Sequence, residues 1–130
     1  MTVYVDASAL VKLVAREEET DALAAFLAQH RSQATSVVAL VEVRRAAARR
    51  PGVAAERVED VLGRISAIGF DLTMVAAAGS IGPVTLRTLD AIHLASAAAL
   101  GQDLEAFVTY DHRLADAARM LGMRDAAPGA

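Results

Sequence analysis

The sequence predicts an α/β domain built on a mainly parallel sheet of four or five strands. Short runs rich in β-branched residues alternate along the 130-residue chain with longer alanine- and leucine-rich runs of helical length. This alternation is typical of strand–helix–strand units, whose crossovers are right-handed by default. Because 55% of the residues are hydrophobic, the chain can bury one continuous core. We therefore expect a single domain over residues 1–125 and a loose tail over 126–130.

The first third of the chain is expected to contain two strands and two helices. We predict a strand over Val3–Val5, a helix after Ser8, a helix opened by the acidic run Glu17–Asp21, and a strand over Gln33–Thr35. Leucines recur at helical spacing in both helices, and acidic residues favour the positive amino end of a helix.

The middle of the chain predicts two further helices and a short strand. Ser36 is a candidate N-cap for a helix over Val37–Arg49, which Pro51-Gly52 ends. Apolar residues at helical spacing predict an amphipathic helix over Val53–Ile68, followed by a short strand over Phe70–Leu72. Glycine and proline at residues 79, 82 and 83 mark a turn region.

The last third predicts a central helix, a strand and a terminal helix. Thr88 is a candidate N-cap for a helix over Leu89–Leu100, which is apolar around most of its circumference. Ala106–Thr109 has the composition of a strand, and Asp111 is placed to cap a helix over His112–Leu121.

Composition excludes several classes of protein. The chain has no cysteine, which rules out a disulfide scaffold and any thiolate metal site and is compatible with a reducing cytoplasm. The amino terminus lacks the features of a secretory signal, and no apolar run is long enough to span a membrane. The net charge of -3 gives no global electrostatic case for nucleic-acid binding.

Four carboxylates occupy positions that indicate a cation site. Asp6 and Asp111 follow predicted strands, whereas Glu42 and Asp90 interrupt apolar helical segments. Ligands of open parallel sheets bind beyond the carboxyl ends of the strands, so all four side chains can face one crevice. A buried carboxylate must be protonated, paired with a base or bound to a metal, because leaving it unpaired is costly.

Each carboxylate also has an ordinary structural explanation. Asp6 and Asp111 are good helix N-caps, Asp90 suits the first turn of a helix, and Glu42 is spaced to pair with Arg45. Glu42 is the hardest to explain in this way, because its sequence neighbours are apolar.

A carboxylate cluster without cysteine is the ligand set that Mg²⁺ or Mn²⁺ prefers. Such ions bind a scissile phosphate and lower the pKa of water, so phosphodiester hydrolysis is the natural reaction. His93 and His112 lie near Asp90 and Asp111 and are candidates for proton transfer, although a lone helical histidine is more often structural.

Several polar and basic side chains lie close to this set in sequence. Ser8, Ser36 and Thr109 can donate hydrogen bonds to the carboxylates or to water, although Ser8 and Ser36 are equally good helix caps. Ser8 and Thr109 can also contact a bound RNA. Arginine clusters after Glu42, where the choice is between a solvated helix face and contacts to RNA phosphates or to acidic residues of a partner. The candidates for such contacts are Arg44, Arg45 and Arg49, next to Arg50.

Four segments, taken together and in order, resemble the PIN domain, and specifically the VapC-type toxins of bacterial toxin–antitoxin pairs. The resemblance spans nearly the whole chain, and it is carried by Val5–Leu10, Ser36–Glu42, Leu89–Ala95 and Thr109–Leu114. It implies a three-layer αβα sandwich and a divalent-metal endoribonuclease site formed by Asp6, Glu42, Asp90 and Asp111. Asp6 and Asp90 look like the core metal pair.

The resemblance also implies a cytoplasmic RNA substrate, a homodimer, and a small VapB-like antitoxin that silences the enzyme. Two alternatives share the fold: a housekeeping RNA-processing nuclease and a non-catalytic interaction module. Phosphoaspartate proteins are disfavoured, because the phosphatase pattern needs an aspartate where Ser8 stands and a receiver needs a late lysine.

Overall fold

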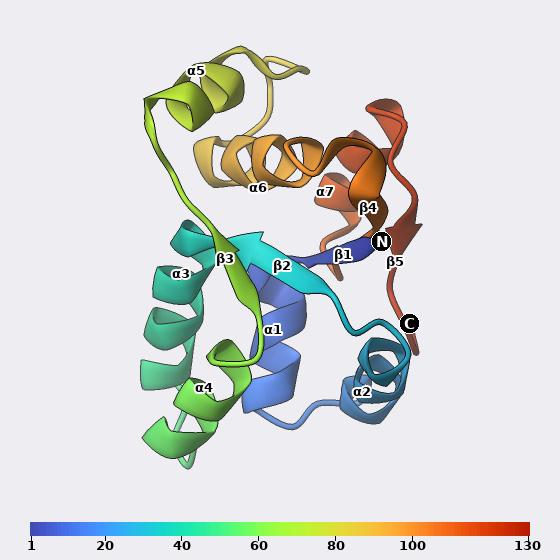
Figure 1. The fold of residues 1–130 in the computed structure, drawn as a ribbon. Helices are drawn as coiled ribbons and strands as arrows, with labels where there is room; N and C mark the ends of the chain where they lie inside the picture. The colour runs from blue at the N-terminus through green and yellow to red at the C-terminus, as the bar shows by residue number, and fades with distance from the viewer.

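The computed structural model describes all 130 residues, and a five-stranded parallel sheet lies at its centre (Figure 1). The strands are β1 (Thr2–Val5), β2 (Gln33–Ser36), β3 (Ser66–Ile68), β4 (Leu104–Val108) and β5 (Asp125–Ala126). They pair in the order β3-β2-β1-β4-β5, with every neighbouring pair parallel. The predicted α/β fold with a sheet of four or five strands is confirmed.

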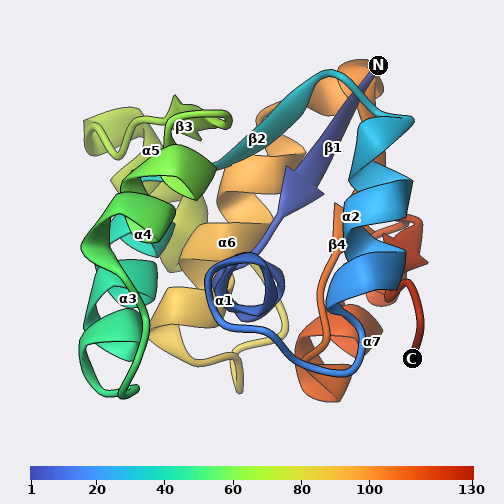
Figure 2. The same cartoon turned by 90° about the horizontal axis from the view of Figure 1, so that it is seen from below.

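Seven helices cover the two faces of this sheet and complete the three-layer αβα sandwich. They are α1 (Ala7–Val14), α2 (Thr20–Ala28), α3 (Val37–Ala48), α4 (Ala55–Leu62), α5 (Leu72–Ser80), α6 (Thr88–Ala98) and α7 (His112–Met120). Helices α1 to α4 lie on one face and α5 to α7 on the other, as the two views show (Figures 1 and 2). No helix is long and apolar enough to cross a membrane.

The alternation of side chains along β1 divides the core between the two faces. Val3 and Val5 belong to the larger apolar cluster, which α1, α2, α3 and α4 cover. Tyr4 points to the other side, where it packs with Phe107 of β4, Leu94 of α6 and Leu114 of α7. Because successive strand residues face opposite sides, a strand buried on both faces is apolar throughout.

Side-chain caps explain where several helices begin. Asp6, Ser36, Asp71 and Asp111 each accept a hydrogen bond from a backbone N–H in the first turn of α1, α3, α5 and α7. The predicted caps Ser36 and Asp111 are confirmed. The prediction for Thr88 is wrong, because α6 already includes that residue and no side chain caps this helix.

The segment between α3 and α6 differs most from the prediction. The expected helix over Val53–Ile68 ends at Leu62, and Ser66–Ile68 forms β3 instead of the predicted Phe70–Leu72 strand. Helix α5 was not expected, because its alanine-rich sequence has no clear apolar face and Gly79 suggested a turn. Its presence shows that Gly79 is accommodated within a helix that Asp71 caps.

The tail is more ordered than predicted. Ala126 pairs with Val108 at the edge of the sheet, so β5 runs one residue beyond the expected domain boundary. The hydroxyl of Tyr110 donates a 2.7 Å hydrogen bond to the Pro128 carbonyl. Residues 126–128 therefore pack on the domain.

Candidate metal centre

The four predicted carboxylates lie on four segments near the carboxyl edge of the sheet. The chain builds β1, β2 and β3 toward one side and then returns to add β4 and β5 on the other, so the strand order reverses between β1 and β4. Asp6 follows β1 and Asp111 closely follows β4, while Glu42 on α3 and Asp90 on α6 come from opposite faces of the sheet. This reversal is where open parallel sheets bind ligands.

Asp6 is buried and firmly held, with only 3% of its surface exposed. One carboxylate oxygen accepts hydrogen bonds from Ser8 Oγ at 2.7 Å and the Ala9 N–H at 3.0 Å, and the other accepts one from Thr109 Oγ1 at 2.5 Å. Burial raises the pKa of Asp6, and these three hydrogen bonds and the nearby His93 oppose the rise. The same carboxylate therefore serves as a helix cap and as a buried group at the site.

The hydrogen bonds of Ser8 and Thr109 extend from Asp6 to Asp111. Ser8 Oγ accepts the Tyr110 N–H at 3.0 Å, and Thr109 Oγ1 accepts the Asp111 N–H at 3.1 Å. Asp111 in turn caps α7 with one oxygen, which accepts from the N–H groups of Arg113 and Leu114. The expectation that Ser8 and Thr109 donate to the carboxylates is confirmed at Asp6.

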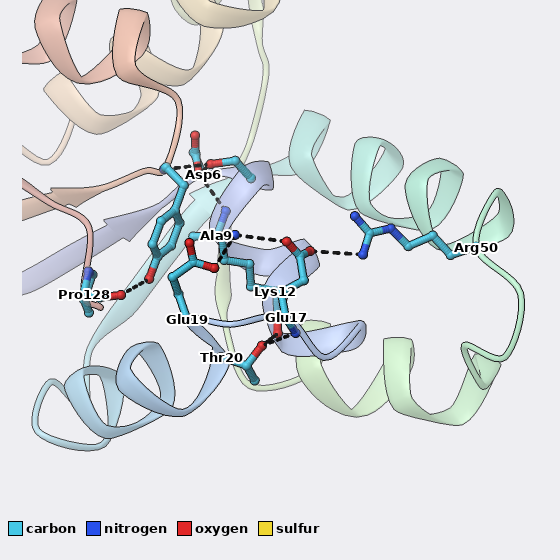
Figure 3. Close-up of polar contacts among 10 residues, drawn as sticks. Asp6, Ala9, Lys12, Glu17, Glu19, Thr20, Arg50 and Pro128 are labelled. Atoms are coloured by element: carbon cyan, nitrogen blue, oxygen red, sulfur yellow. Dashed lines mark hydrogen bonds and ion pairs between the residues drawn. The ribbon is translucent and has the colours of Figure 1, made fainter. Parts of the chain in front are cut away.

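Tyr110 connects this loop to Lys12 and to the carboxyl-terminal segment, and Figure 3 shows Lys12 with its partners Glu17 and Glu19. Its ring lies against the ammonium of Lys12, with 4.6 Å between Nζ and the ring centroid, and its hydroxyl bonds to the Pro128 carbonyl. Lys12 is held by Glu17 and Glu19, each 3.0 Å from Nζ. A buried cation with two carboxylate partners thus supports the loop that carries Thr109 and Asp111.

Glu42 does not pair with Arg45, as its spacing had suggested, but with His93. His93 Nε2 lies 2.7 Å from Glu42 Oε1, and His93 Nδ1 lies 2.7 Å from the hydroxyl of Tyr4. The Ser36 N–H donates to that hydroxyl at 3.1 Å, which leaves the hydroxyl proton free to point to Nδ1. This arrangement puts the imidazole proton on Nε2, facing the carboxylate, and connects Glu42 to the core of the sheet.

Asp90 lies in the first turn of α6, and no hydrogen bond holds its carboxylate. Burial raises its pKa, and the charge of Asp111 raises it further, against the influence of His93, Arg87 and Arg113. Burial and the charge of Asp111 therefore outweigh these nearby basic groups, and a bound cation would stabilise the ionised carboxylate of Asp90.

The set of donors suits a hard divalent cation, although the side chains do not yet form a complete ligand cage. No three acidic or histidine side chains converge as a metal-binding group. Oxygens without a hydrogen-bond partner remain on Glu42, Asp90 and Asp111, and a carboxylate-rich set without cysteine favours Mg²⁺ or Mn²⁺ over softer metals.

The arginines that follow Glu42 separate into two groups. Arg45 and Arg49 line a hollow of about 350 Å³ together with Ser8, Glu42 and Leu89. Arg44 instead forms an ion pair with Glu59 at 2.9 Å, and Arg50 forms one with Glu17 at 3.0 Å. Of the three predicted contact arginines, two therefore lie beside the carboxylates and Arg44 lies apart from them.

Sequence reasoning did not place His93 in this network and gave no role to Tyr4, Arg87 or Arg113. His93 had one available signal: it lies one turn after Asp90 in a helical segment otherwise filled with apolar residues, where a polar side chain needs a partner. His112, the other candidate for proton transfer, is exposed and makes no side-chain hydrogen bond.

The fold and the site together define an α/β protein with an acidic centre at the point where the strand order of its sheet reverses. A profile of the PIN domain matches residues 3–120, and the chain belongs to the PIN domain family. It is 43% identical to "Ribonuclease VapC47" of Mycobacterium tuberculosis, with 98% of each chain covered, and 42% identical to "Ribonuclease VapC46", with 97% of each covered.

Two solved structures share the fold at low sequence identity. One is the crystal structure of VapBC2 from Rickettsia felis bound to a DNA fragment from its promoter, with a TM-score of 0.66, 15% identity, and 97% of this chain and 98% of that chain covered. The other is Mycobacterium tuberculosis VapC20, a Sarcin-Ricin loop cleaving toxin, with a TM-score of 0.71, 14% identity, and 97% and 99% covered.

Proposed function

We propose that the protein is the toxin of a type II toxin–antitoxin pair and acts as an Mg²⁺- or Mn²⁺-dependent endoribonuclease. The observation that carries this proposal is the position of Asp6, Glu42, Asp90 and Asp111 on four separate segments near the carboxyl edge of the sheet, where the strand order reverses. Support comes from relatives named as VapC ribonucleases, which match at 42–43% identity over nearly the whole chain.

In this proposal the four carboxylates have different roles in binding the ion. Asp6 and Asp90 form the core pair, and Glu42 and Asp111 hold the ion or orient water through their free oxygens. When bound, the ion polarises the scissile phosphate and eases the deprotonation of water. His93 fixes the carboxylate of Glu42, and Thr109 fixes that of Asp6, so both are positioning residues.

The proposal includes a cytoplasmic RNA substrate, a VapB-like antitoxin partner and a homodimer. Exposed apolar side chains beyond α6 suit burial against another chain, since Leu72 and Val84 lie open to solvent near Phe70 and Val75. Arg45 and Arg49 are placed for RNA phosphates or for acidic residues of the antitoxin.

The test is cleavage of a structured RNA mixture by the purified chain, with Mg²⁺ or Mn²⁺ against EDTA. Asp6→Asn removes one proposed ligand, while Asp60→Asn makes the same change at an exposed position of α4 and serves as the matched control. We expect metal-dependent cutting by the wild type and by Asp60→Asn only. Equal cutting by Asp6→Asn would contradict the site.

Induced expression in a bacterial culture tests the toxin assignment separately from the chemistry. We expect the wild type to arrest growth and Asp6→Asn to leave growth unaffected. Metal-dependent cutting in vitro without growth arrest would instead favour a housekeeping nuclease.

A further inference from the structure

Tyr4 places a buried hydroxyl behind the acidic centre, in the middle strand of the sheet. None of its surface is exposed, and its ring stacks on that of Phe107 with 5.2 Å between centroids and 12° between planes. Phenylalanine would pack in the same way, whereas the hydroxyl of a buried tyrosine needs a hydrogen-bond partner. The hydroxyl therefore calls for an explanation other than packing.

This one hydroxyl bonds to both of the segments that carry the less firmly held carboxylates. It accepts the N–H of Ser36 at 3.1 Å, and Ser36 caps α3, the helix that carries Glu42. It also lies 2.7 Å from Nδ1 of His93, on α6, the helix that carries Asp90. The hydroxyl thus joins β1 to the start of α3 and to the side of α6.

The two bonds of the hydroxyl determine the state of the imidazole. The Ser36 N–H can only donate, so the hydroxyl proton is directed to His93 Nδ1, which must then be the unprotonated nitrogen. The proton of the ring is left on Nε2, 2.7 Å from Glu42 Oε1. Half a turn of the ring would present carbon atoms to both partners, so the bond to Tyr4 also fixes the orientation of the ring.

We propose that Tyr4 is a positioning residue of the metal centre. Its hydroxyl selects the Nε2–H tautomer and the orientation of His93, and His93 then holds Oε1 of Glu42 and leaves the second carboxylate oxygen for the cation. The inference rests on the proposed nuclease function and extends it from the ligands to a core residue that touches neither metal nor RNA.

A purely structural role is the explanation to be excluded. Tyr4→Phe leaves the Ser36 N–H without an acceptor, so it should destabilise the fold whether or not the hydroxyl also controls His93. Two measurements separate these roles: the tautomer of His93, and the dependence of the Tyr4→Phe effect on the imidazole.

The tautomer is measured by NMR on protein with ¹⁵N-labelled histidine, in EDTA. Long-range proton–nitrogen correlations show which ring nitrogen carries the proton, and His93→Gln identifies the signals of His93 among the three histidines. The carboxylate of Glu42 itself favours Nε2–H, so the background is Glu42→Gln, whose amide can either donate or accept. We expect the Nε2–H tautomer in this background and a mixture of tautomers when Tyr4→Phe is added.

Tyr110→Phe is the matched control for this measurement. It removes the hydroxyl of the other tyrosine, which bonds to Pro128 and does not touch His93, so the Nε2–H tautomer should persist. The same tautomer with and without the hydroxyl of Tyr4 would overturn the proposal. A doubly protonated or Nδ1–H ring in the Glu42→Gln background would overturn it as well.

The second measurement is the affinity for Mn²⁺, determined by calorimetry. We expect Tyr4→Phe to weaken binding about tenfold, the lower end of the range for residues that orient metal ligands. In the His93→Gln background there is no Nδ1 to orient, so adding Tyr4→Phe should change the affinity by about twofold at most. An equal loss in both backgrounds would mean that Tyr4 does not act through His93.

Leu23→Ala controls for stability, because Leu23 is fully buried on α2 and belongs to the apolar cluster on the other face of the sheet from Tyr4. It should destabilise the protein without weakening Mn²⁺ binding, and a tenfold loss here would reduce the effect of Tyr4→Phe to stability. A wild type that binds no Mn²⁺ would overturn the metal centre and with it this role of Tyr4. The tautomer, measured without metal, shows in that case that the failure lies in the proposed function.

Discussion

The two halves of the acidic centre differ in how the protein holds them. Asp6 is buried and accepts three hydrogen bonds, and the network around it reaches Asp111 through Thr109. Asp90 has no hydrogen-bond partner and lies in the first turn of α6, a helix that no side chain caps. Folding alone therefore fixes the position of the Asp6 carboxylate. The Asp90 carboxylate is left for a bound cation or substrate to position.

The largest expected effect on cleavage comes from replacing Asp90, the carboxylate that no hydrogen bond holds. Asp90→Asn should lower the rate of metal-dependent cleavage about a thousandfold, because an ion contributes several kcal/mol of charge stabilisation. The melting temperature without metal should stay the same or rise, since the change removes repulsion from Asp111. If Mn²⁺ still raised the melting temperature of the variant as it does that of the wild type, Asp90 would not be a ligand.

The link between Glu42 and His93 provides a finer test, with two substitutions of matched chemistry. His93→Gln keeps an N–H donor near the position of Nε2, facing Glu42, whereas His93→Asn keeps a polar group only near Nδ1, facing Tyr4. Losing the orienting bond should reduce cleavage about 10- to 100-fold. We expect His93→Asn to show this loss and His93→Gln to recover part of it.

Cleavage rate and Mn²⁺ affinity, measured beside the free energy of unfolding, separate positioning from stability. A positioning role predicts that the two variants differ in cleavage and Mn²⁺ affinity although they are destabilised alike. If cleavage simply followed stability in both variants, His93 would be no more than a core residue.

Thr109→Val removes a hydrogen bond that holds the Asp6 carboxylate, without changing the shape of the side chain. It removes the hydrogen bond to one carboxylate oxygen of Asp6, while the other oxygen keeps its bonds from Ser8 and Ala9, and it leaves the Asp111 N–H without a partner inside the protein. Such a loss costs about 1–3 kcal/mol of unfolding free energy, which urea denaturation can measure. Thr73→Val, on the exposed face of α5, is the control and should change stability little. An equal effect of both variants would mean that Thr109 does not support Asp6.

The smallest effect is a pH dependence of the metal-free protein. Because the pKa of Asp6 is raised by burial, the folded state holds a proton that the unfolded chain has already lost. The contribution of Asp6 to stability should therefore fall as pH rises from the ordinary carboxyl pKa to the raised value. The stability of Asp6→Asn relative to wild type, measured in EDTA, should increase across this range. A constant difference would contradict the raised pKa.

Local signals in the sequence were sufficient for much of the fold. Ser36 and Asp111 marked helix starts because each has a side-chain oxygen just before an apolar helical run. The Val53–Ile68 prediction failed because β3 is only three residues long and is specified by pairing with β2, which no local pattern shows. Helix α5 was missed because its alanine-rich sequence has little periodicity.

The site was predictable to the level of its acidic residues and not of their partners. Strand ends and interrupted apolar runs identified Asp6, Glu42, Asp90 and Asp111, whose functional roles remain predictions. The partners depend on contacts between distant parts of the chain, such as the bond between Tyr4 and His93 across 89 positions. Which arginines lack a partner likewise becomes known only once the acidic residues are placed in space.

The strand order has a consequence for the timing of synthesis. β1 is made first, but one of its two neighbours, β4, leaves the ribosome only after about a hundred further residues. The hydrogen bond from Thr109 to Asp6 joins residues 103 positions apart. Until the later segment is made, Asp6 lacks this hydrogen bond and the centre lacks Asp111. A nascent chain therefore carries an incomplete centre for most of its translation, and the last quarter of the chain completes it.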